Sequence, residues 1–160
     1  MESQETGPQF WLEKFIWESN KIENIIGVSL TDKAAHKALL ALDVIRVPDL
    51  EMFVHTITRD HVLRDKVGLD VQVGNYIPPA GGSDIRTNLH ALLFTLDARS
   101  PFETHLQYEA LHPFTDGNGR SGRALWLWQM LQKGGTSATQ ARGLGFLQTF
   151  YYSVLAQGNG

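Results

Sequence analysis

The spacing of hydrophobic residues along the chain predicts a mainly helical protein. Between residues 10 and 26, Trp11, Phe15, Ile22 and Ile26 recur at intervals of four and seven residues, which places them on one face of an amphipathic helix. Further helices are predicted over residues 31–45, 48–57, 89–96, 101–111, 123–133 and 144–155. The helix over residues 123–133 is apolar around most of its circumference, which is typical of the buried centre of a bundle. A short loop rich in Gly, Ser and Thr separates it from the last helix.

The helical pattern is interrupted between residues 67 and 85. Leu69, Val71 and Val73 alternate with polar or small residues, which is the period of a β-strand, and two prolines and two glycines follow within residues 78–82. We therefore expect a hairpin-like or extended segment at this point. A plain surface connection between two helices is the alternative interpretation.

Composition narrows the functions that remain. The chain has 160 residues, 42% of them hydrophobic, and a formal net charge of -3, so we expect one domain over residues 1–160. The acidic balance argues against a nucleic-acid partner, which would favour a basic face. The sequence has no run of about 18 apolar residues and no basic, apolar leader, so we expect a cytoplasmic protein without a membrane partner. The absence of cysteine excludes disulfides, thiolate catalysis and zinc–thiolate sites.

The segment HPFTDGNGRSGR, which starts at His112, carries the candidate chemistry. Pro113 disfavours a helical conformation at His112, so one helix should end there. Gly117 and Gly119 free the backbone for a tight turn, and the next helix follows at once. Such a turn directs free N–H groups and the positive end of a helix dipole toward one spot, which is an anion-binding site.

Charged side chains surround that spot. Arg120 and Arg123 lie three residues apart and can project toward one side, where guanidinium groups suit phosphate oxygens. Asp116 is a hard oxygen ligand suited to Mg²⁺, and His112 is a candidate general base. Each feature alone also fits a structural histidine or an ordinary turn. Two arginines in a first helical turn oppose the helix dipole, however, which indicates a bound anion.

This segment resembles the signature of the Fic family (filamentation induced by cyclic AMP), H-x-F-x-(D/E)-G-N-G-R-x-x-R. The matching positions are His112, Phe114, Asp116, Gly117, Asn118, Gly119, Arg120 and Arg123. The order of elements is similar from about residue 17 to residue 155. The resemblance implies a Fic-type helical bundle with a β-hairpin flap, and the break at residues 69–85 falls where that flap belongs.

The resemblance also implies an activity, namely the transfer of AMP from ATP to a Ser, Thr or Tyr hydroxyl of a target protein. In such a protein adenylyltransferase, His112 would deprotonate the hydroxyl and Asp116 would hold Mg²⁺. Phe114 would point into the core and position the loop. The nucleotide would be bound by Gly117, Asn118, Gly119, Arg120 and Arg123.

The first predicted helix resembles the family's inhibitory motif, (S/T)-x-x-x-E-(G/N), with Ser19, Glu23 and Asn24 at its fixed positions. Ser19 and Glu23 are four residues apart and share a helix face. The resemblance implies that Glu23 pairs with Arg123, occupies the position of the γ-phosphate and represses the enzyme. The alternative is a solvated glutamate on an amphipathic helix.

The flap is the candidate docking edge for the target protein. Gly74, Asn75, Tyr76 and Ile77 would form its working edge and bind an extended target segment by strand addition. Pro78 lacks an N–H donor and so limits that edge.

Other functions are compatible with the same residues. One is removal of AMP from modified targets, or transfer of another phosphoryl or nucleotide-derived group. Another is a non-enzymatic regulator that senses nucleotide. The helix with Glu23 could act within one chain or across a homodimer. We expect His105 and Tyr108 to be structural, whereas Tyr151 and Tyr152 could line an adenine pocket or belong to the core.

Overall fold

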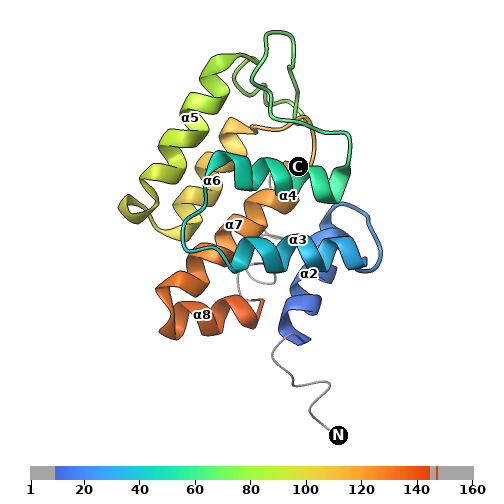
Figure 1. The fold of residues 1–160 in the computed structure, drawn as a ribbon, viewed down its shortest axis with the longest axis vertical. Helices are drawn as coiled ribbons and strands as arrows, with labels where there is room; N and C mark the ends of the chain where they lie inside the picture. Colours follow the sequence, from blue (N-terminus) through green and yellow to red (C-terminus); the bar gives the residue numbers. More distant parts are fainter. Residues whose placement is uncertain (1–9, 145–146, 148–160) are drawn as a thin grey trace, which may run out of the picture.

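The fold is a bundle of α-helices, described by a computed structural model for residues 10–144 and 147 (Figure 1). The α-helices are α2 (Phe10–Ile22), α3 (Leu30–Leu40), α4 (Val47–Thr58), α5 (Ser83–Phe94), α6 (Pro101–Leu111), α7 (Asn118–Lys133) and α8 (Gly135–Arg142). A short 3₁₀ helix, Leu96–Ala98, joins α5 to α6. The predicted mainly helical class is confirmed.

Helix α7 runs through the middle of the bundle and is buried on nearly every side (Figure 1). It separates two hydrophobic clusters. Leu125 and Trp128 pack into the larger cluster with residues of α3 to α6. Trp126 and Leu127 pack on the opposite side against α2, including Phe15. The prediction that this apolar helix forms the centre of the bundle is therefore confirmed, and the helix holds α2 on one side and α6 on the other.

Capping residues determine where several helices begin. Ser29 and Asp32 exchange side-chain and backbone hydrogen bonds of 3.0 and 3.1 Å at the start of α3. Ser100 and Glu103 form the same reciprocal pair at the start of α6. Helix α2 ends at Ile22, earlier than the predicted residue 26, because the chain turns back just after it.

The loop predicted over residues 134–143 is wrong, because most of this segment forms helix α8. Gly134 has a φ of +68°, so it ends α7 and lets α8 start in a new direction. Ala138 and Ala141 are buried, which shows that tertiary packing stabilises a segment whose local composition favours a loop. The predicted last helix, with Tyr151 and Tyr152, lies outside the described residues except for Leu144 and Leu147, which are both buried.

The flap segment, defined as residues 69–82, lies at the end of the bundle shown at the top of Figure 1. It does not form the predicted β-hairpin. Only Val73 and Tyr76 pair, through two N–H···O bonds of 2.9 Å around Gly74, whose φ is +59°. Beyond this turn, Pro78 and Pro79 cannot donate to a ladder. Side chains bridge the two arms instead, as where Asp70 Oδ1 accepts a hydrogen bond of 2.8 Å from the Gly81 N–H.

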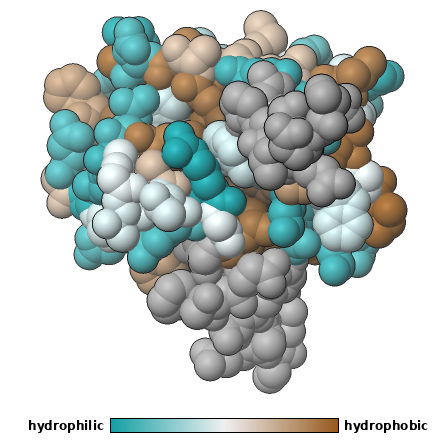
Figure 2. All heavy atoms as spheres, turned by 90° about the horizontal axis from the view of Figure 1, so that it is seen from below, coloured by the Kyte–Doolittle hydropathy of each residue, from teal (hydrophilic) through white to brown (hydrophobic). Residues whose placement is uncertain are grey.

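The surface mixes hydrophilic and hydrophobic side chains on the face seen from below in Figure 2. None of the described helices combines the length and the apolar character that a membrane span needs.

Candidate active site

The loop between α6 and α7 has a conformation set by its own side chains. Helix α6 ends at Leu111, and the next residue, His112, adopts the left-handed conformation with a φ of +49°. Phe114 is fully buried, as predicted, and anchors the loop in the larger hydrophobic cluster. Gly117 has a φ of +81° and starts α7. The left-handed conformation is uncommon for a residue other than glycine, such as His112. The contacts around the loop therefore hold it in this shape.

Asn118 closes the loop. Its Oδ1 accepts a hydrogen bond of 2.8 Å from the Phe114 N–H, and its Nδ2 donates one of 2.8 Å to the Phe114 carbonyl. Both groups of the amide are thus engaged with backbone. The structure therefore places this side chain inside the loop rather than facing a ligand, although the sequence suggested a phosphate contact.

Residues 61–64 brace the loop from outside. The Thr115 N–H donates to the Val62 carbonyl at 2.9 Å, and the Arg64 N–H donates to the Pro113 carbonyl at 2.8 Å. His61 Nδ1 lies 2.9 Å from Thr115 Oγ1. The loop is thereby held by a short antiparallel contact in which Leu63 pairs with Phe114.

The first turn of α7 is suited to an anion. It contains no acidic residue, and Arg120 lies in it while Arg123 follows in the next turn. Arg120 is buried, and its Nε has no hydrogen-bond partner among the described residues. A buried guanidinium with an unused donor beside a glycine turn fits a phosphate group, as predicted for this position.

Asp116 is the candidate ligand for Mg²⁺. Its side chain is 62% exposed, and its Oδ2 lies 3.7 Å from His61 Nε2. Among the described residues, no group of three or more His, Asp or Glu side chains could hold a metal by itself. A single carboxylate is nevertheless a sufficient protein ligand where substrate phosphates complete the coordination of Mg²⁺.

The structure brings Glu23 and Arg123, the two residues of the predicted inhibitory pair, into contact. Arg123 is fully buried and donates from Nε to Ser19 Oγ at 2.7 Å, from Nη2 to the Ser19 carbonyl at 2.9 Å, and from Nη2 to Glu23 Oε2 at 2.8 Å. Glu23 lies just beyond the end of α2, and its carboxylate reaches the glycine turn. A Cβ atom added at Gly119 would meet that carboxylate, and it would lie 2.9 Å from Arg123 Nη1.

Asn24, the last residue of the predicted motif, ends this turn. Its φ is +64°, and its N–H donates to the Lys21 carbonyl at 2.9 Å. Asparagine tolerates the left-handed conformation better than most residues, which accounts for its place here.

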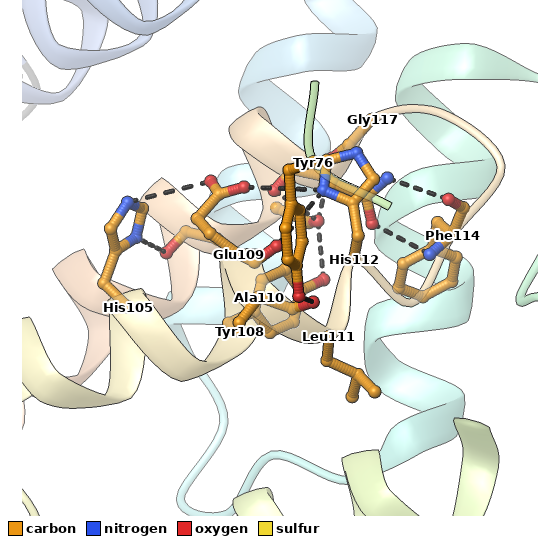
Figure 3. Close-up of polar contacts among 12 residues, drawn as sticks. Tyr76, His105, Tyr108, Glu109, Ala110, Leu111, His112, Phe114 and Gly117 are labelled. Atoms are coloured by element: carbon orange, nitrogen blue, oxygen red, sulfur yellow. Dashed lines mark hydrogen bonds and ion pairs between the residues drawn. The ribbon is translucent and has the colours of Figure 1, made fainter. Parts of the chain in front are cut away.

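His105 and Glu109 of α6 form a chain of side chains with His112 that leads to the loop (Figure 3). Glu109 Oε1 lies 3.8 Å from His112 Nδ1, and its Oε2 lies 3.7 Å from His105 Nε2. His112 Nδ1 also lies 3.4 Å from the Glu109 carbonyl. The contact with the carbonyl favours a proton on Nδ1 and leaves Nε2 free to accept one.

Burial changes the pKa of each of these groups. It lowers the pKa of His112 below its usual value and lowers the pKa of His105 to about 4. It raises the pKa of the Glu109 carboxyl to about 7. Burial also raises the pKa of Tyr108, whose hydroxyl lies 2.6 Å from Ser121 Oγ. His112 is therefore a neutral base near pH 7, while His105 and Tyr108 have the structural positions predicted for them.

The flap segment approaches the end of α6. The Tyr76 hydroxyl donates a hydrogen bond of 2.7 Å to the Ala110 carbonyl, two residues before His112 (Figure 3). Ile77 is 71% exposed, and Val73 and Tyr76 are also exposed. Of the predicted flap residues, Tyr76 thus contacts the loop region directly, and its neighbours Gly74, Asn75 and Ile77 follow the same turn.

Sequence reasoning missed Glu109 and Arg64. Glu109 stands three residues before His112 on a helix, a spacing that could have indicated a contact. Arg64 is fully buried and donates four hydrogen bonds to backbone carbonyls. Nothing in its local sequence separates it from an exposed arginine.

A family model supplies the identification. The model of the Fic/DOC family matches residues 55–130, a range that includes α5, α6, the loop and most of α7. The chain contains a Fic/DOC domain. The resemblance drawn from the loop residues is thus confirmed at the level of the family. A Fic/DOC domain indicates a transferase of nucleotidyl or phosphoryl groups, and proteins of this family typically use ATP and Mg²⁺.

Proposed function

We propose that this Fic/DOC domain transfers AMP from ATP to a Ser, Thr or Tyr hydroxyl of a target protein, and that Glu23 represses the transfer. The observation that carries the proposal is the ion pair between Glu23 and Arg123 at the glycine turn of α7. A carboxylate bound at an anion-binding helix N-terminus occupies the place of a phosphate. The pair therefore links the nucleotide site to its own inhibitor.

In the transfer itself, His112 accepts the proton of the target hydroxyl at Nε2. The hydroxyl oxygen forms a bond to the α-phosphorus of ATP as the bond from that phosphorus to the bridging oxygen breaks, and pyrophosphate leaves. The N–H groups of the turn at Gly117 and Gly119 and the guanidinium of Arg120 orient the phosphates. Catalysis then depends on alignment and charge stabilisation, which are the main requirements of phosphate transfer.

Asp116 is the residue that would hold Mg²⁺ together with the phosphates. When bound, Mg²⁺ neutralises negative charge on the phosphate chain. The carboxylate of Asp116 is exposed at the start of the turn, so it has room to bind the ion together with the phosphates.

Repression follows from competition for Arg123. The γ-phosphate and the Glu23 carboxylate are both anionic, so they cannot share one guanidinium without repulsion. Three hydrogen bonds from Arg123 to Ser19 and Glu23 hold the inhibited arrangement. Removal of the carboxylate frees the position without disturbing the anchor to Ser19.

The partner in this proposal is a target protein that docks on the exposed turn around Tyr76. An extended segment of the target would bind along this turn, beside the end of α6 where the Tyr76 hydroxyl donates to the Ala110 carbonyl.

The decisive experiment compares wild type with Glu23→Gly in the presence of labelled ATP, Mg²⁺ and a cell lysate. We expect labelling of protein to rise about tenfold or more, which corresponds to about 1.4 kcal/mol of relieved competition. Glu13→Gly is the matched control, because Glu13 lies on α2, the helix that precedes Glu23, and pairs with Lys33 at 2.7 Å, away from Arg123.

Mass spectrometry of the labelled protein tests the group that is transferred. An added adenylyl group supports the proposal, and an added phosphoryl group contradicts it. Equal labelling by wild type and Glu23→Gly would show that Glu23 does not repress the enzyme.

A further inference from the structure

Among the described residues, Arg64 is the most deeply buried cation outside the candidate nucleotide site, and its exposed fraction is 0%. Its Nε donates to the His112 carbonyl at 2.7 Å, and its Nη2 donates to the Leu111 carbonyl at 2.9 Å. Its Nη1 donates to the Leu69 carbonyl at 3.0 Å and to the Pro79 carbonyl at 2.9 Å. All three nitrogens of the guanidinium are therefore used.

The four acceptors belong to two separate parts of the molecule. The carbonyls of Leu111 and His112 are at the end of α6. His112, the candidate base, is the left-handed residue at this point. The carbonyls of Leu69 and Pro79 lie in the two arms of the flap segment. One side chain thus ties both arms of the flap to the backbone of the base.

Only a guanidinium suits this arrangement. It presents five N–H donors in a planar fork, whereas the ammonium of lysine is a compact point charge with three. The bonded partners of the Arg64 side chain are carbonyls, with no carboxylate among them. The carbonyls at the end of α6 also carry the negative end of its dipole, which favours a cation there.

We infer that Arg64 is a positioning residue, which holds the flap segment and His112 in one fixed relation so that a target docked on the flap meets the base. The expected effect of Arg64 on AMP transfer rests on the proposed function. The backbone of Arg64 supports the same arrangement, since its N–H donates to Pro113 and its carbonyl accepts from Gly82 at 3.0 Å. Arg64 therefore contacts the loop and the flap through both its backbone and its side chain.

The test uses Arg64→Met and Arg64→Lys in the full chain, with Arg86→Met as the matched control. Arg86 pairs with Glu51 and Asp65 at 2.8 and 3.0 Å, next to the same region, but bonds neither the flap nor the loop. Arg64→Lys keeps the charge and most of the aliphatic stem. If Arg64→Met does not fold, Arg64→Lys is therefore the variant that tests the positioning role.

The first measurement is amide hydrogen exchange, which does not require activity. In the Arg64 variants we expect exchange to rise about tenfold or more both in the flap, at Gly81 and Gly82, and in the loop, at Thr115. The control should leave both segments protected. A folded Arg64 variant in which only one of the two segments responds would overturn the inference.

The second measurement uses the Glu23→Gly background and the target protein identified with that variant. We expect kcat to fall about tenfold or more and KM for the target to rise, while the Kd for ATP stays within about threefold, because Arg64 does not contact the nucleotide turn. A fall that merely follows the folded fraction would show a structural role only. If Glu23→Gly itself transfers no AMP, the proposed function fails, and the exchange measurement still decides the role of Arg64.

Discussion

At the scale of single residues, His112 combines an uncommon backbone conformation with a chemically poised ring. Its left-handed φ of +49° turns the chain from α6 into the loop, and its Nδ1 faces the Glu109 carbonyl at 3.4 Å. Burial lowers the pKa of the ring, so the neutral form that a general base requires is present at pH 7. Position and protonation state thus agree with one role.

Replacing His112 with alanine should abolish transfer and spare nucleotide binding. In the Glu23→Gly background, we expect AMP transfer to fall about 10² to 10⁴-fold, the usual contribution of a positioned base. ATP binding, followed by calorimetry, should change little, because the anion site lies on α7. Undiminished labelling of the target by the double variant would remove His112 from the mechanism.

Glu109 is costly to ionise in the folded protein, since burial raises the pKa of its carboxyl from 4.5 to about 7. The unfolded chain ionises this group more readily, so its contribution to the free energy of unfolding is largest at acid pH and is lost as the pH rises to 7.

Glu109→Gln should therefore be more stable than wild type at pH 8, by about 1–3 kcal/mol, and equal to it near pH 4. Urea denaturation at the two pH values measures the difference. A variant that is less stable at pH 8 would indicate that the ionised carboxylate stabilises the fold.

At the scale of elements, polar contacts at the end of α2 add to its hydrophobic packing against α7. Asn20 is 1% exposed, and its Nδ2 donates to the Gly27 carbonyl at 2.9 Å and to Asp32 Oδ2 at 3.0 Å. These bonds tie the end of α2 to the start of α3, one residue after Ser19. The same anchor thus holds the segment that presents Glu23 to Arg123.

Asn20→Ala should loosen this anchor. We expect a loss of about 1–3 kcal/mol in the free energy of unfolding, because buried acceptors lose their donor. We also expect AMP transfer to exceed that of wild type, since Glu23 is held less firmly. Thermal denaturation and labelling with ATP measure the two effects, and an unchanged rate of transfer in the destabilised variant would separate α2 docking from repression.

The elements also show where periodicity is a sufficient guide. Helix α6 matches its predicted range, because Pro101 marks its start. Helix α7 ends before Gly134 as predicted, but it begins at Asn118, five residues before the predicted start. Helix α8 was not predicted because its small residues have no clear helical pattern. The burial of Ala138 and Ala141 in the core stabilises this helix. The predicted hairpin is wrong because alternation alone does not supply a partner strand.

At the scale of the whole molecule, buried neutral histidines couple the fold to pH. His36 and His105 are both buried, and burial lowers the pKa of each to about 4. The unfolded chain binds more protons between pH 4 and 6.5, so each histidine makes stability fall as the pH drops through that range.

His36→Gln should weaken this acid sensitivity. The slope of the free energy of unfolding against pH should decrease by about 1.4 kcal/mol per pH unit between pH 4 and 6.5, which is the effect of one proton. The comparison with wild type cancels the opposite contribution of Glu109. Denaturation at several pH values measures it, and parallel curves for the two proteins would contradict the lowered pKa.

The sequence by itself determined the helical class, the central helix and the position of the candidate catalytic loop. These features depend on contiguous residues, because a helix repeats every 3.6 residues and the loop motif spans only twelve positions. His112, Asp116 and the two arginines are therefore identifiable from a short stretch of sequence, and the inhibitory pair is identifiable through a family resemblance.

Tertiary structure alone decided the contacts between distant segments. Arg64 is separated from the His112 carbonyl that it binds by 48 positions, and the carboxylate of Glu109 lies between His105 and His112. The side chain of Asn118 likewise turned inward to close the loop. A buried arginine and an exposed one have the same local sequence signal, and only the contacts of Arg64 with the flap segment and the end of α6 distinguish them.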